Sequence, residues 1–167
     1  MKTLLYFFIC TLTFAITACS DDNNDENNSI PTQPNYYSFE DKKTTNIIYA
    51  SYENEDSGFN FFLSPENPTA HPWDSSEVLI VQVPIELFNK KIDLINETSL
   101  NWEAFGQINI NNEKYHWQSG GWNLTRDDSW MKVTKNGEDN FTIEIDVEVR
   151  GKTVKAYYKG NFKNISN

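Results

Sequence analysis

Apolar and polar residues alternate with a period of two over most of the chain beyond residue 36, and no long helical period is present. Alternation of this kind predicts β-strands with one buried and one exposed face. Strands are expected at Thr45–Tyr52, Gly58–Ser64, Glu77–Val83, Ile92–Ile95, Phe105–Ile110, Glu113–Ser119, Ser129–Lys135, Phe141–Arg150 and Thr153–Phe162. This pattern predicts an all-β fold, an antiparallel β-sandwich or alternatively a small up-and-down, calycin-like barrel.

Three local signals refine this prediction. Residues 78–83 are apolar on both faces, which indicates a strand near the centre of its sheet. Pro84 favours a single short helical turn within residues 83–91, and at most this one short helix is expected. Asn111-Asn112 suits a two-residue hairpin turn, because Asn tolerates the left-handed backbone region.

The last two expected strands form a hairpin with regular alternation on both sides. A type II′ turn at Gly151-Lys152 would pair Arg150 with Thr153. The expected cross-strand pairs are then Val149–Val154, Val147–Ala156, Ile145–Tyr158, Glu148–Lys155 and Glu144–Lys159.

The preceding hairpin must keep Met131 and Val133 on the core side and Trp130 outward. This arrangement requires an odd number of loop residues, because an even number would exchange the two faces. A three- or five-residue loop is therefore expected through Lys135–Asp139, with Gly137 at positive φ. The expected core pairs are Met131–Ile143 and Val133–Phe141.

The N-terminus has the pattern of a signal peptide, with Lys2 before an apolar stretch from Leu4 to Ile16. That stretch is shorter than the roughly 20 residues that cross a bilayer, and acidic residues follow it. Ile16-Thr17-Ala18-Cys19 resembles a bacterial lipobox, in which the cysteine is diacylglycerylated and the preceding peptide is removed. The resemblance implies that residues 1–18 are a lipoprotein signal peptide and that Cys19 carries a lipid anchor.

The other cysteine, Cys10, lies inside the apolar stretch, so the mature chain would have one thiol and no internal disulfide. Residues 19–35 are expected to be a disordered acidic tether, because this segment has almost no apolar residue to bury. Acidic residues after the lipidated cysteine also resemble the surface-export signal of Bacteroidota lipoproteins. This resemblance implies an outer-membrane location facing the cell exterior, with the periplasmic face as the alternative.

Residues 36–167 then form a single β domain of ordinary length. The whole chain has 24 Asp and Glu against 14 Lys and Arg, and its formal net charge is −10. An acidic chain without a basic cluster argues against nucleic acid as a partner. Contact with a membrane is expected only through the N-terminal lipid.

The sequence contains no recognisable motif for catalysis, for a metal or for a cofactor. Its two histidines, His71 and His116, lack a Ser or Cys partner in a known arrangement, and both are expected at the surface. HExxH, CxxC and phosphate-binding glycine motifs are absent from the sequence. The alternative to a non-catalytic protein is a surface hydrolase that uses paired carboxylates, which the many acidic residues of the chain could supply.

The five tryptophans carry more information about binding. Trp102, Trp117 and Trp122 share faces with apolar neighbours and are expected in the core. The expected registers instead place aromatic and charged residues together on one outer sheet face: Trp130, Lys132, Glu144, Asp146, Tyr157 and Lys159. Exposed aromatic rings beside hydrogen-bonding groups suit stacking on sugars, as bases stack on aromatic platforms.

Trp73, in the loop sequence HPWD, is a further candidate contact residue. Two alternatives exist for the outer face around Trp130. The segment NYYSFED or a partner protein would cover it, or its residues would simply be exposed.

Three segments resemble parts of small surface lipoproteins of gut Bacteroidota, a group of unknown function. They are NIIYASYENEDSGFNFFLSPEN, VPIELFNKKIDL and SWMKVTKNGEDNFTIEIDVEVRGKTVKAYYKGNF, and they cover most of the mature domain. The resemblance supplies no catalytic residue. It implies a binding or accessory role, since such lipoproteins often accompany outer-membrane nutrient-uptake systems.

The sequence therefore favours a lipid-anchored, non-catalytic module at the cell surface. Its partner would be a glycan or another nutrient, or an outer-membrane protein on which it docks. A concave site with an aromatic residue and a carboxylate would favour a ligand, whereas a large outward apolar patch would favour docking.

Replacement of Cys19 by alanine tests the lipid anchor. We expect Cys19→Ala to leave the domain folded and to move the protein from the membrane fraction to the soluble fraction, because the acyl chains lose their attachment point. Cell fractionation followed by immunoblotting measures this. Cys19→Ala protein that still sediments with membranes would contradict the prediction.

Overall fold

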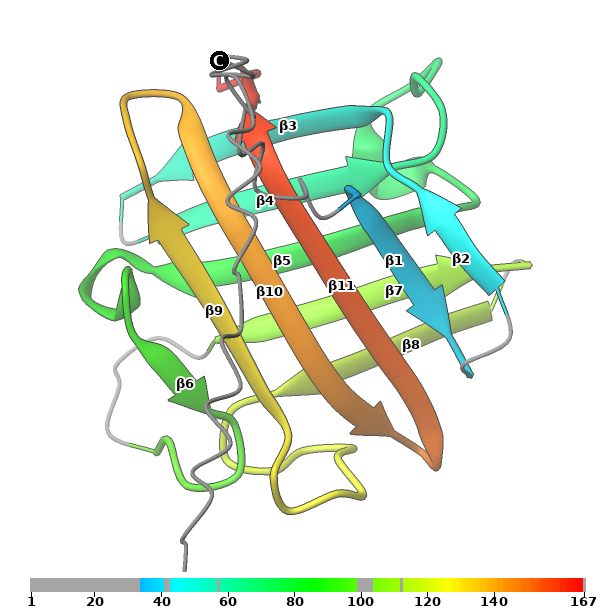
Figure 1. Ribbon diagram of the computed structural model, residues 1–167, viewed down its shortest axis with the longest axis vertical. Helices are drawn as coiled ribbons and strands as arrows, with labels where there is room; N and C mark the ends of the chain where they lie inside the picture. The colour runs from blue at the N-terminus through cyan, green and yellow to red at the C-terminus, as the bar shows by residue number, and fades with distance from the viewer. Residues whose placement is uncertain (1–33, 41–42, 57, 99–103, 112, 167) are drawn as a thin grey trace, which may run out of the picture. The chain divides into compact units, whose positions relative to one another are not determined.

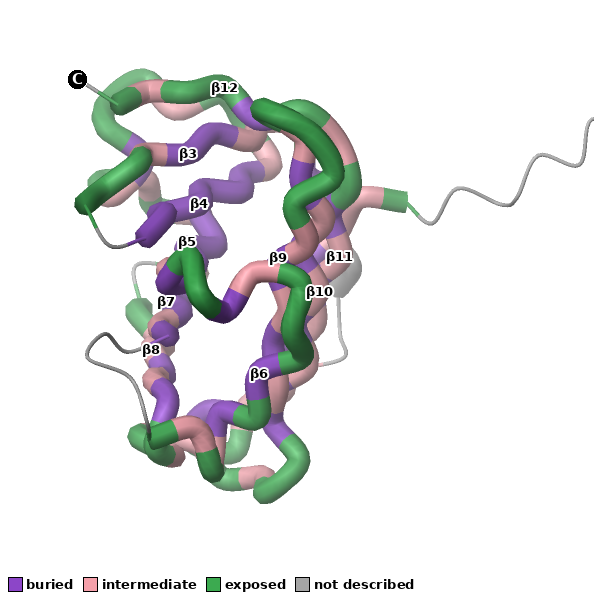
Figure 2. The backbone as a smooth tube through the Cα atoms, turned by 90° about the vertical axis from the view of Figure 1, so that its left-hand side faces the viewer, coloured by how far each residue is buried: buried purple, intermediate pink, exposed green. Residues whose placement is uncertain are grey.

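The computed structural model describes residues 34–40, 43–56, 58–98, 104–111 and 113–166, which form two six-stranded sheets packed face to face (Figures 1 and 2). The predicted sandwich is confirmed, and the alternative of a closed barrel is wrong because the two sheets are separate hydrogen-bonded layers. The predicted signal peptide, Cys19 and most of the tether lie outside the described residues.

Sheet A contains, in spatial order, β2 (Lys43–Asn46), β1 (Tyr36–Phe39), β11 (Lys152–Asn161), β10 (Asn140–Val149), β9 (Trp130–Lys135) and β6 (Lys91–Asp93). Sheet B contains β12 (Lys163–Asn164), β3 (Tyr49–Glu55), β4 (Gly58–Ser64), β5 (Val78–Pro84), β7 (Phe105–Ile110) and β8 (Glu113–Gln118). The strands pair in antiparallel fashion except for β12, which runs parallel to β3. Figure 1 shows the long strands of sheet A crossing over those of sheet B.

Two short 3-10 helices are the helical elements of the described residues: η1 (Pro72–Asp74) and η2 (Ile85–Leu87). The second is the helical turn predicted after Pro84, whereas the first was not predicted. Within the described part of the chain, no helix has the length and apolar character needed to span a bilayer.

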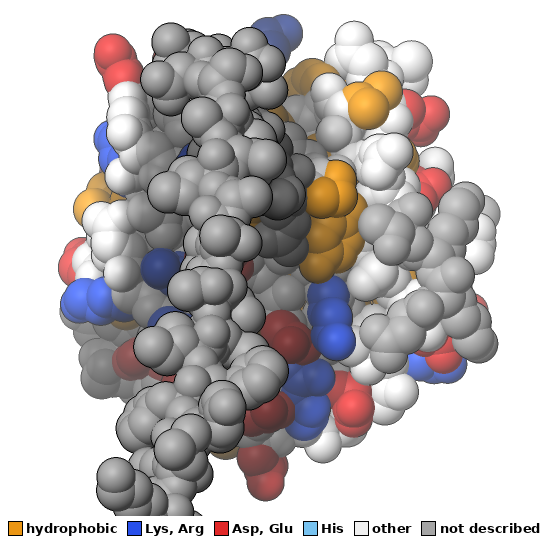
Figure 3. Space-filling view, viewed as in Figure 1, with side chains coloured by type: hydrophobic (Ala, Val, Ile, Leu, Met, Phe, Trp, Pro, Cys, Tyr) orange, Lys and Arg blue, Asp and Glu red, His pale blue; other side chains and the backbone are white. Residues whose placement is uncertain are grey.

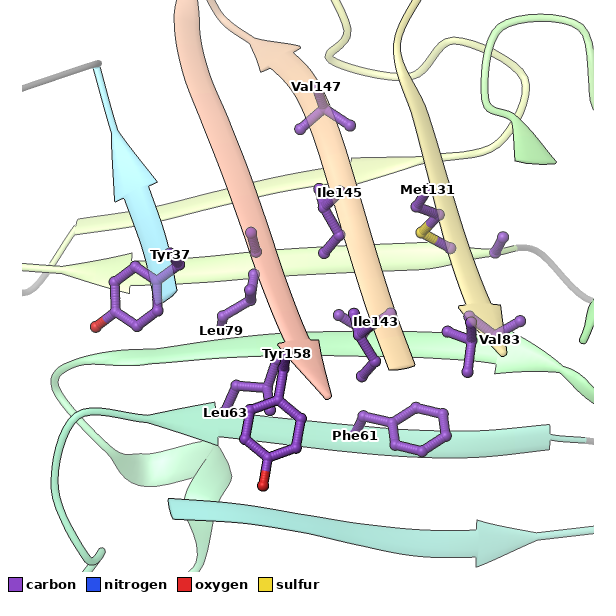
Figure 4. Close-up of a cluster of buried hydrophobic side chains, with 14 of the residues drawn as sticks. Tyr37, Phe61, Leu63, Leu79, Val83, Met131, Ile143, Ile145, Val147 and Tyr158 are labelled. Carbon is purple, nitrogen blue, oxygen red and sulfur yellow. The ribbon is translucent and has the colours of Figure 1, made fainter. Parts of the chain in front are cut away.

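The core lies between the two sheets and follows the predicted alternation. In β10 the odd-numbered residues from Phe141 to Val149 are buried, and the residues between them are half-buried on the outer face. Opposite them, sheet B contributes Phe61, Leu63, Leu79 and Val83 (Figure 4). Full burial of one such side chain contributes about 1.5–3 kcal/mol, so this layer is the main source of stability.

β5 is central in sheet B, as its apolar character on both faces predicted. The turn after β7 is also confirmed, since Ile110 pairs with Glu113 and Asn111 has a φ of 53°.

The N-terminal strands differ from the prediction. The chain leaves sheet A after Asn46 and enters sheet B at Tyr49, so the single strand predicted over Thr45–Tyr52 is two strands in different sheets. Tyr36–Phe39 pairs along the edge of β11 and widens sheet A. The suggestion that this segment covers the outer face is therefore wrong, because its four residues add an edge strand instead.

The β10–β11 hairpin has the predicted faces and a different register. Arg150 and Gly151 have φ values of 50° and 74°, which is typical of a type I′ turn, and Val149 pairs with Lys152. The predicted type II′ turn is therefore wrong, and the predicted cross-strand pairs differ from the observed pairs by a shift of two residues. A shift of two keeps every side chain on its own face, so the apolar pattern does not distinguish the two registers.

The β9–β10 loop has the predicted odd length, because Lys135 pairs with Phe141 and five residues connect them. Its register is also shifted by two, so that Met131 faces Ile145 and Val133 faces Ile143. The predicted positive φ of Gly137 is wrong. The loop closes differently, since the N–H groups of Asn136 and Gly137 both donate to the carbonyl of Asn140.

Gly106 tests the packing of the core. It pairs with Trp117, which is fully buried, and a Cβ atom at Gly106 would overlap Cε2 and Cζ2 of the indole. We expect Gly106→Ala to lower the free energy of unfolding by about 1–3 kcal/mol, the usual cost of overpacking. Chemical denaturation measures the change.

Gly137→Ala is the matched control, because the added Cβ would lie 3.5 Å from Cβ of Asn140 in an exposed loop. Equal stability of the two variants would contradict this account of the core.

Candidate functional site

A pocket on the outer face of sheet B is the strongest candidate for a binding site. Its volume is about 250 Å³, and its lining residues come from the η1 loop, β7 and β8: Trp73, Asp74, Ser75, Ser76, Asn109 and Lys114. It includes Trp73, one of the contact residues predicted from the sequence.

The η1 loop is fixed to sheet B through His71. Its Nδ1 atom accepts from the N–H of Trp73 at 3.4 Å, and its Nε2 atom lies 2.7 Å from Oε1 of Glu53 in β3. An acceptor role for Nδ1 leaves the proton on Nε2, which therefore donates to Glu53. His71 is exposed as predicted, and it positions the neighbouring tryptophan.

The indole of Trp73 packs on a small apolar cluster on the outer face of sheet B. Its ring meets Phe62 edge-to-face, with centroids 5.5 Å apart, and Phe62 belongs to a fully buried group with Val78 and Ile80. Trp73 itself is only half-buried. The ring is thus held in place from one side while part of it still faces the pocket.

Asn109 forms the polar wall of the pocket. It is 3% exposed, its Nδ2 donates to the carbonyl of Ser75 at 3.0 Å, and its Oδ1 accepts from Nε2 of Gln107 at 2.9 Å. These bonds connect the loop to β7. By contrast, no hydrogen bond or ion pair among the described residues involves the side chains of Asp74, Ser76 or Lys114.

The other predicted residues lie together on the outer face of sheet A, on the opposite side of the sandwich from Trp73. The strand registers place five of these six residues, with their neighbours, in two rows across the sheet: Lys91, Lys132, Glu144, Tyr157 and Tyr36 in one, and Asp93, Trp130, Asp146, Lys155 and Ser38 in the next. The sixth, Lys159, lies outside these rows and pairs with Thr142. The register predicted from the core pairs would set Trp130 opposite Glu144, and this is wrong because Trp130 pairs with Asp146. Figure 3 shows acidic and basic side chains interspersed on this side of the molecule.

Many of the charges on the outer face of sheet A are paired with one another. A guanidinium nitrogen of Arg126 lies 2.5 Å from Asp146, and Nζ of Lys132 lies 3.8 Å from Glu144. The ammonium of Lys91 lies 4.3 Å from the centre of the Trp130 ring. This face is therefore a network of mixed charge, and neither Trp130 nor its charged neighbours line the cavities at Trp73, Tyr37 and Tyr158.

Those three cavities contain few carboxylates. The Trp73 pocket has Asp74, a second cavity of about 200 Å³ beside Tyr37 has Glu77, and the third, of about 560 Å³, has none. None of these three cavities therefore contains the two carboxylates that a hydrolase of this kind would need, and the hydrolase alternative stays a prediction. Among the described residues, no group of three His, Cys, Asp or Glu side chains is arranged to hold a metal ion.

An aromatic group beside β8 was not predicted. Trp122 is 53% exposed, and its ring lies 4.8 Å from that of His116, which in turn stacks on Phe105 at 6.5 Å. The prediction of a core position holds for Trp117 and is wrong for Trp122, while Trp102 lies outside the described residues.

The turn before Trp122 explains the error. Gly120 and Gly121 have positive φ, as does Asn123, and the chain folds back so that Trp122 bridges to Gln118. Such a reversal interrupts the alternation that was extrapolated from β8. The Gly-Gly pair was the sequence signal for this turn.

Comparisons with known proteins do not assign the chain to a family. No protein-family model, curated protein or solved structure matches it.

The contact between Trp122 and His116 is open to a direct test. Burial, with a smaller contribution from the charge of Arg150, lowers the pKa of His116 below its usual 6.5, because the protonated ring is less well solvated. We expect Trp122→Ala to raise the pKa of His116 toward 6.5, since water would reach the imidazole. NMR titration of the imidazole protons measures the midpoint.

The imidazole signals of His71, which lies in the η1 loop, serve as the internal control and should not respond to Trp122→Ala. An unchanged His116 midpoint would show that the indole does not shield the imidazole.

Proposed function

We propose that this protein is a non-catalytic, lipid-anchored surface module that captures glycans through the Trp73 pocket. The observation that carries the proposal is a concave site in which a half-buried indole lies beside a carboxylate and an ammonium without partners among the described residues. Aromatic walls with a few convergent polar groups are typical of small-molecule sites.

The chemistry of the pocket matches that of a sugar ring. A pyranose has an apolar C–H surface that packs on an indole, and a rim of hydroxyl groups that both donate and accept. Asp74 accepts hydrogen bonds, Lys114 donates them, and Ser76 does both. Because the negative charge of Asp74 and the positive charge of Lys114 cancel, the pocket has no net charge, which favours a neutral sugar.

The size of the pocket supports a small unit of ligand. Its volume of about 250 Å³ lies just below the range of roughly 300–1,000 Å³ that is typical of sites for drug-sized ligands. We therefore infer that a single sugar residue occupies the pocket, with the rest of a glycan outside it.

Docking on an outer-membrane protein has less support from the structure. The large hydrophobic side chains exposed among the described residues are Ile48 between β2 and β3, Ile85 in η2 and Trp122 between β8 and β9. They do not form the continuous apolar patch that marks a stable docking surface. A role next to a nutrient-uptake system agrees with ligand capture.

Binding measurements with Trp73→Ala test the proposal. Loss of one stacked aromatic costs roughly 1–3 kcal/mol, so we expect a neutral glycan that binds the protein to bind Trp73→Ala about tenfold more weakly or worse. A glycan array identifies the ligand, and isothermal titration calorimetry measures the affinity. Asp74→Asn and Lys114→Ala should also weaken binding, and they remove no packing from the loop.

Trp130→Ala on sheet A is the control and should bind like the wild type. Undiminished binding by Trp73→Ala would overturn the assignment, and a loss confined to Trp130→Ala would move the site to sheet A. Absence of glycan binding by the wild-type protein would remove the proposed function altogether.

A further inference from the structure

The outer face of sheet B continues from the Trp73 pocket along the β7–β8 hairpin. Three cross-strand pairs follow one another on this face: Asn109–Lys114 at the pocket, then Gln107–His116, then Phe105–Gln118. The distance from Lys114 to Gln118 along β8 is roughly 14 Å, at about 3.4 Å per residue. Trp122 bridges to Gln118 and completes the far end.

The side chains between the two ends carry no formal charge. Gln107 and Gln118 are amides, and Gln82 of β5 lies on the same face, because it pairs with Phe105. Within the described residues, the side chains of Gln82 and Gln118 take part in no hydrogen bond. Burial and, to a smaller extent, the charge of Arg150 lower the pKa of His116 and so disfavour its protonated form.

Gln107 connects this middle section with the pocket. Its Nε2 atom donates to Asn109, the same side chain that holds the η1 loop through Ser75. The pocket and the amide section are thus parts of one hydrogen-bonded surface.

The aromatic end is fixed before any ligand binds. Asn123 donates from Nδ2 to the carbonyl of His116 at 3.1 Å, and the N–H of Gly121 donates to the carbonyl of Leu94 at 3.0 Å. The N–H of Arg150 donates to the carbonyl of Asn123, which connects the turn to the β10–β11 hairpin. A turn held at three points presents the Trp122 ring with little loss of conformational entropy on binding.

We propose that the glycan site extends from the Trp73 pocket along β8 to the His116–Trp122 ring pair, and that its ligand is an extended, uncharged glycan chain. This inference rests on the proposed function. One sugar would occupy the pocket, the following sugars would lie over His116 and meet the half-buried amide of Gln118, and a later sugar would stack on Trp122.

The chemistry of the surface selects for such a chain. Amides donate and accept hydrogen bonds, as sugar hydroxyls do, and they offer no charge to attract a sulfated or carboxylated glycan. The aromatic groups at the two ends suit a ligand long enough to contact both, because a second contact within one ligand raises affinity without a new association cost. A free monosaccharide would use only the pocket.

Chain length therefore separates the two parts of the site. The probes are methyl glycosides of glucose, mannose, galactose and xylose, together with neutral oligosaccharides of the same sugars, measured by isothermal titration calorimetry. We expect Trp122→Ala to lower the affinity for the bound oligosaccharide by on the order of tenfold and to leave the affinity for its methyl glycoside unchanged. Trp73→Ala should lower both affinities.

Gln118→Ala is the second variant, since it removes an amide from the surface without altering the Gly120–Asn123 turn, and it should weaken only the oligosaccharide. Trp130→Ala is the matched control and should bind both probes like the wild type. Oligosaccharide binding unchanged in both Trp122→Ala and Gln118→Ala, with a loss in Trp73→Ala, would overturn the extension and leave the pocket in place.

Three further outcomes would overturn the extension. Weaker methyl glycoside binding by Trp122→Ala would show that the two ends are not separate subsites, and tighter binding of anionic than of neutral oligosaccharides would contradict an uncharged ligand. Failure of every probe to bind the wild-type protein would overturn the extension together with the proposed function.

Discussion

Phe141 of β10 packs edge-to-face against Phe61 of β4, with ring centroids 5.0 Å apart, and this contact joins the two sheets. The rings of Tyr52, Phe59 and Phe162 surround the pair at 5.3–6.3 Å. Because side chains alternate along a strand, placing these rings inward determines which residues of both sheets face outward. The composition of each outer face follows from this one constraint.

The two outer faces are nevertheless built differently. Phe61 and Phe62 are consecutive, so they point to opposite faces of sheet B, and both are fully buried. The outer face around Phe62 therefore needs a cover, which the η1 loop supplies through Trp73. A loop covers less area than a third layer would, and the pocket lies at its border with β7 and β8. The pocket is thus a consequence of how sheet B buries its second apolar face.

The period-two pattern correctly predicted which side chains of β9, β10 and β11 face the core and which face outward. It did not predict the register of the β9–β10 hairpin or of the β10–β11 hairpin. The reason is that a shift of two residues preserves every face, so that only turn geometry decides between registers. In the last hairpin that geometry depends on a positive φ at Arg150, a conformation that a non-glycine residue rarely adopts. Residue type alone does not reveal it.

The candidate site was predictable only in part, for a related reason. Trp73 lies in a Pro-flanked loop, where a tryptophan is conspicuous, but its partners Asn109 and Lys114 are distant in sequence and join it through the pairing of β5, β7 and β8. Trp122 was assigned to the core by extending the alternation of β8 across a turn with three positive φ values. Alternation is informative within a strand and ends at such a turn.

The difference in charge between the two faces favours sheet B as the binding surface. A neutral ligand over Trp130 would have to displace the ammonium of Lys91 from the ring, and it would cover the ion pair between Arg126 and Asp146. Removing charges from water is costly unless new partners replace it, and sugar hydroxyls are weaker partners than a carboxylate or a guanidinium. Over Gln118 the same ligand meets an amide, whose desolvation costs less and is offset by the hydrogen bonds that the hydroxyls form. The paired charges of sheet A contribute about 0–1 kcal/mol each to stability, so their main effect is to keep that broad face soluble, and the proposed uncharged ligand would lose less by binding to sheet B.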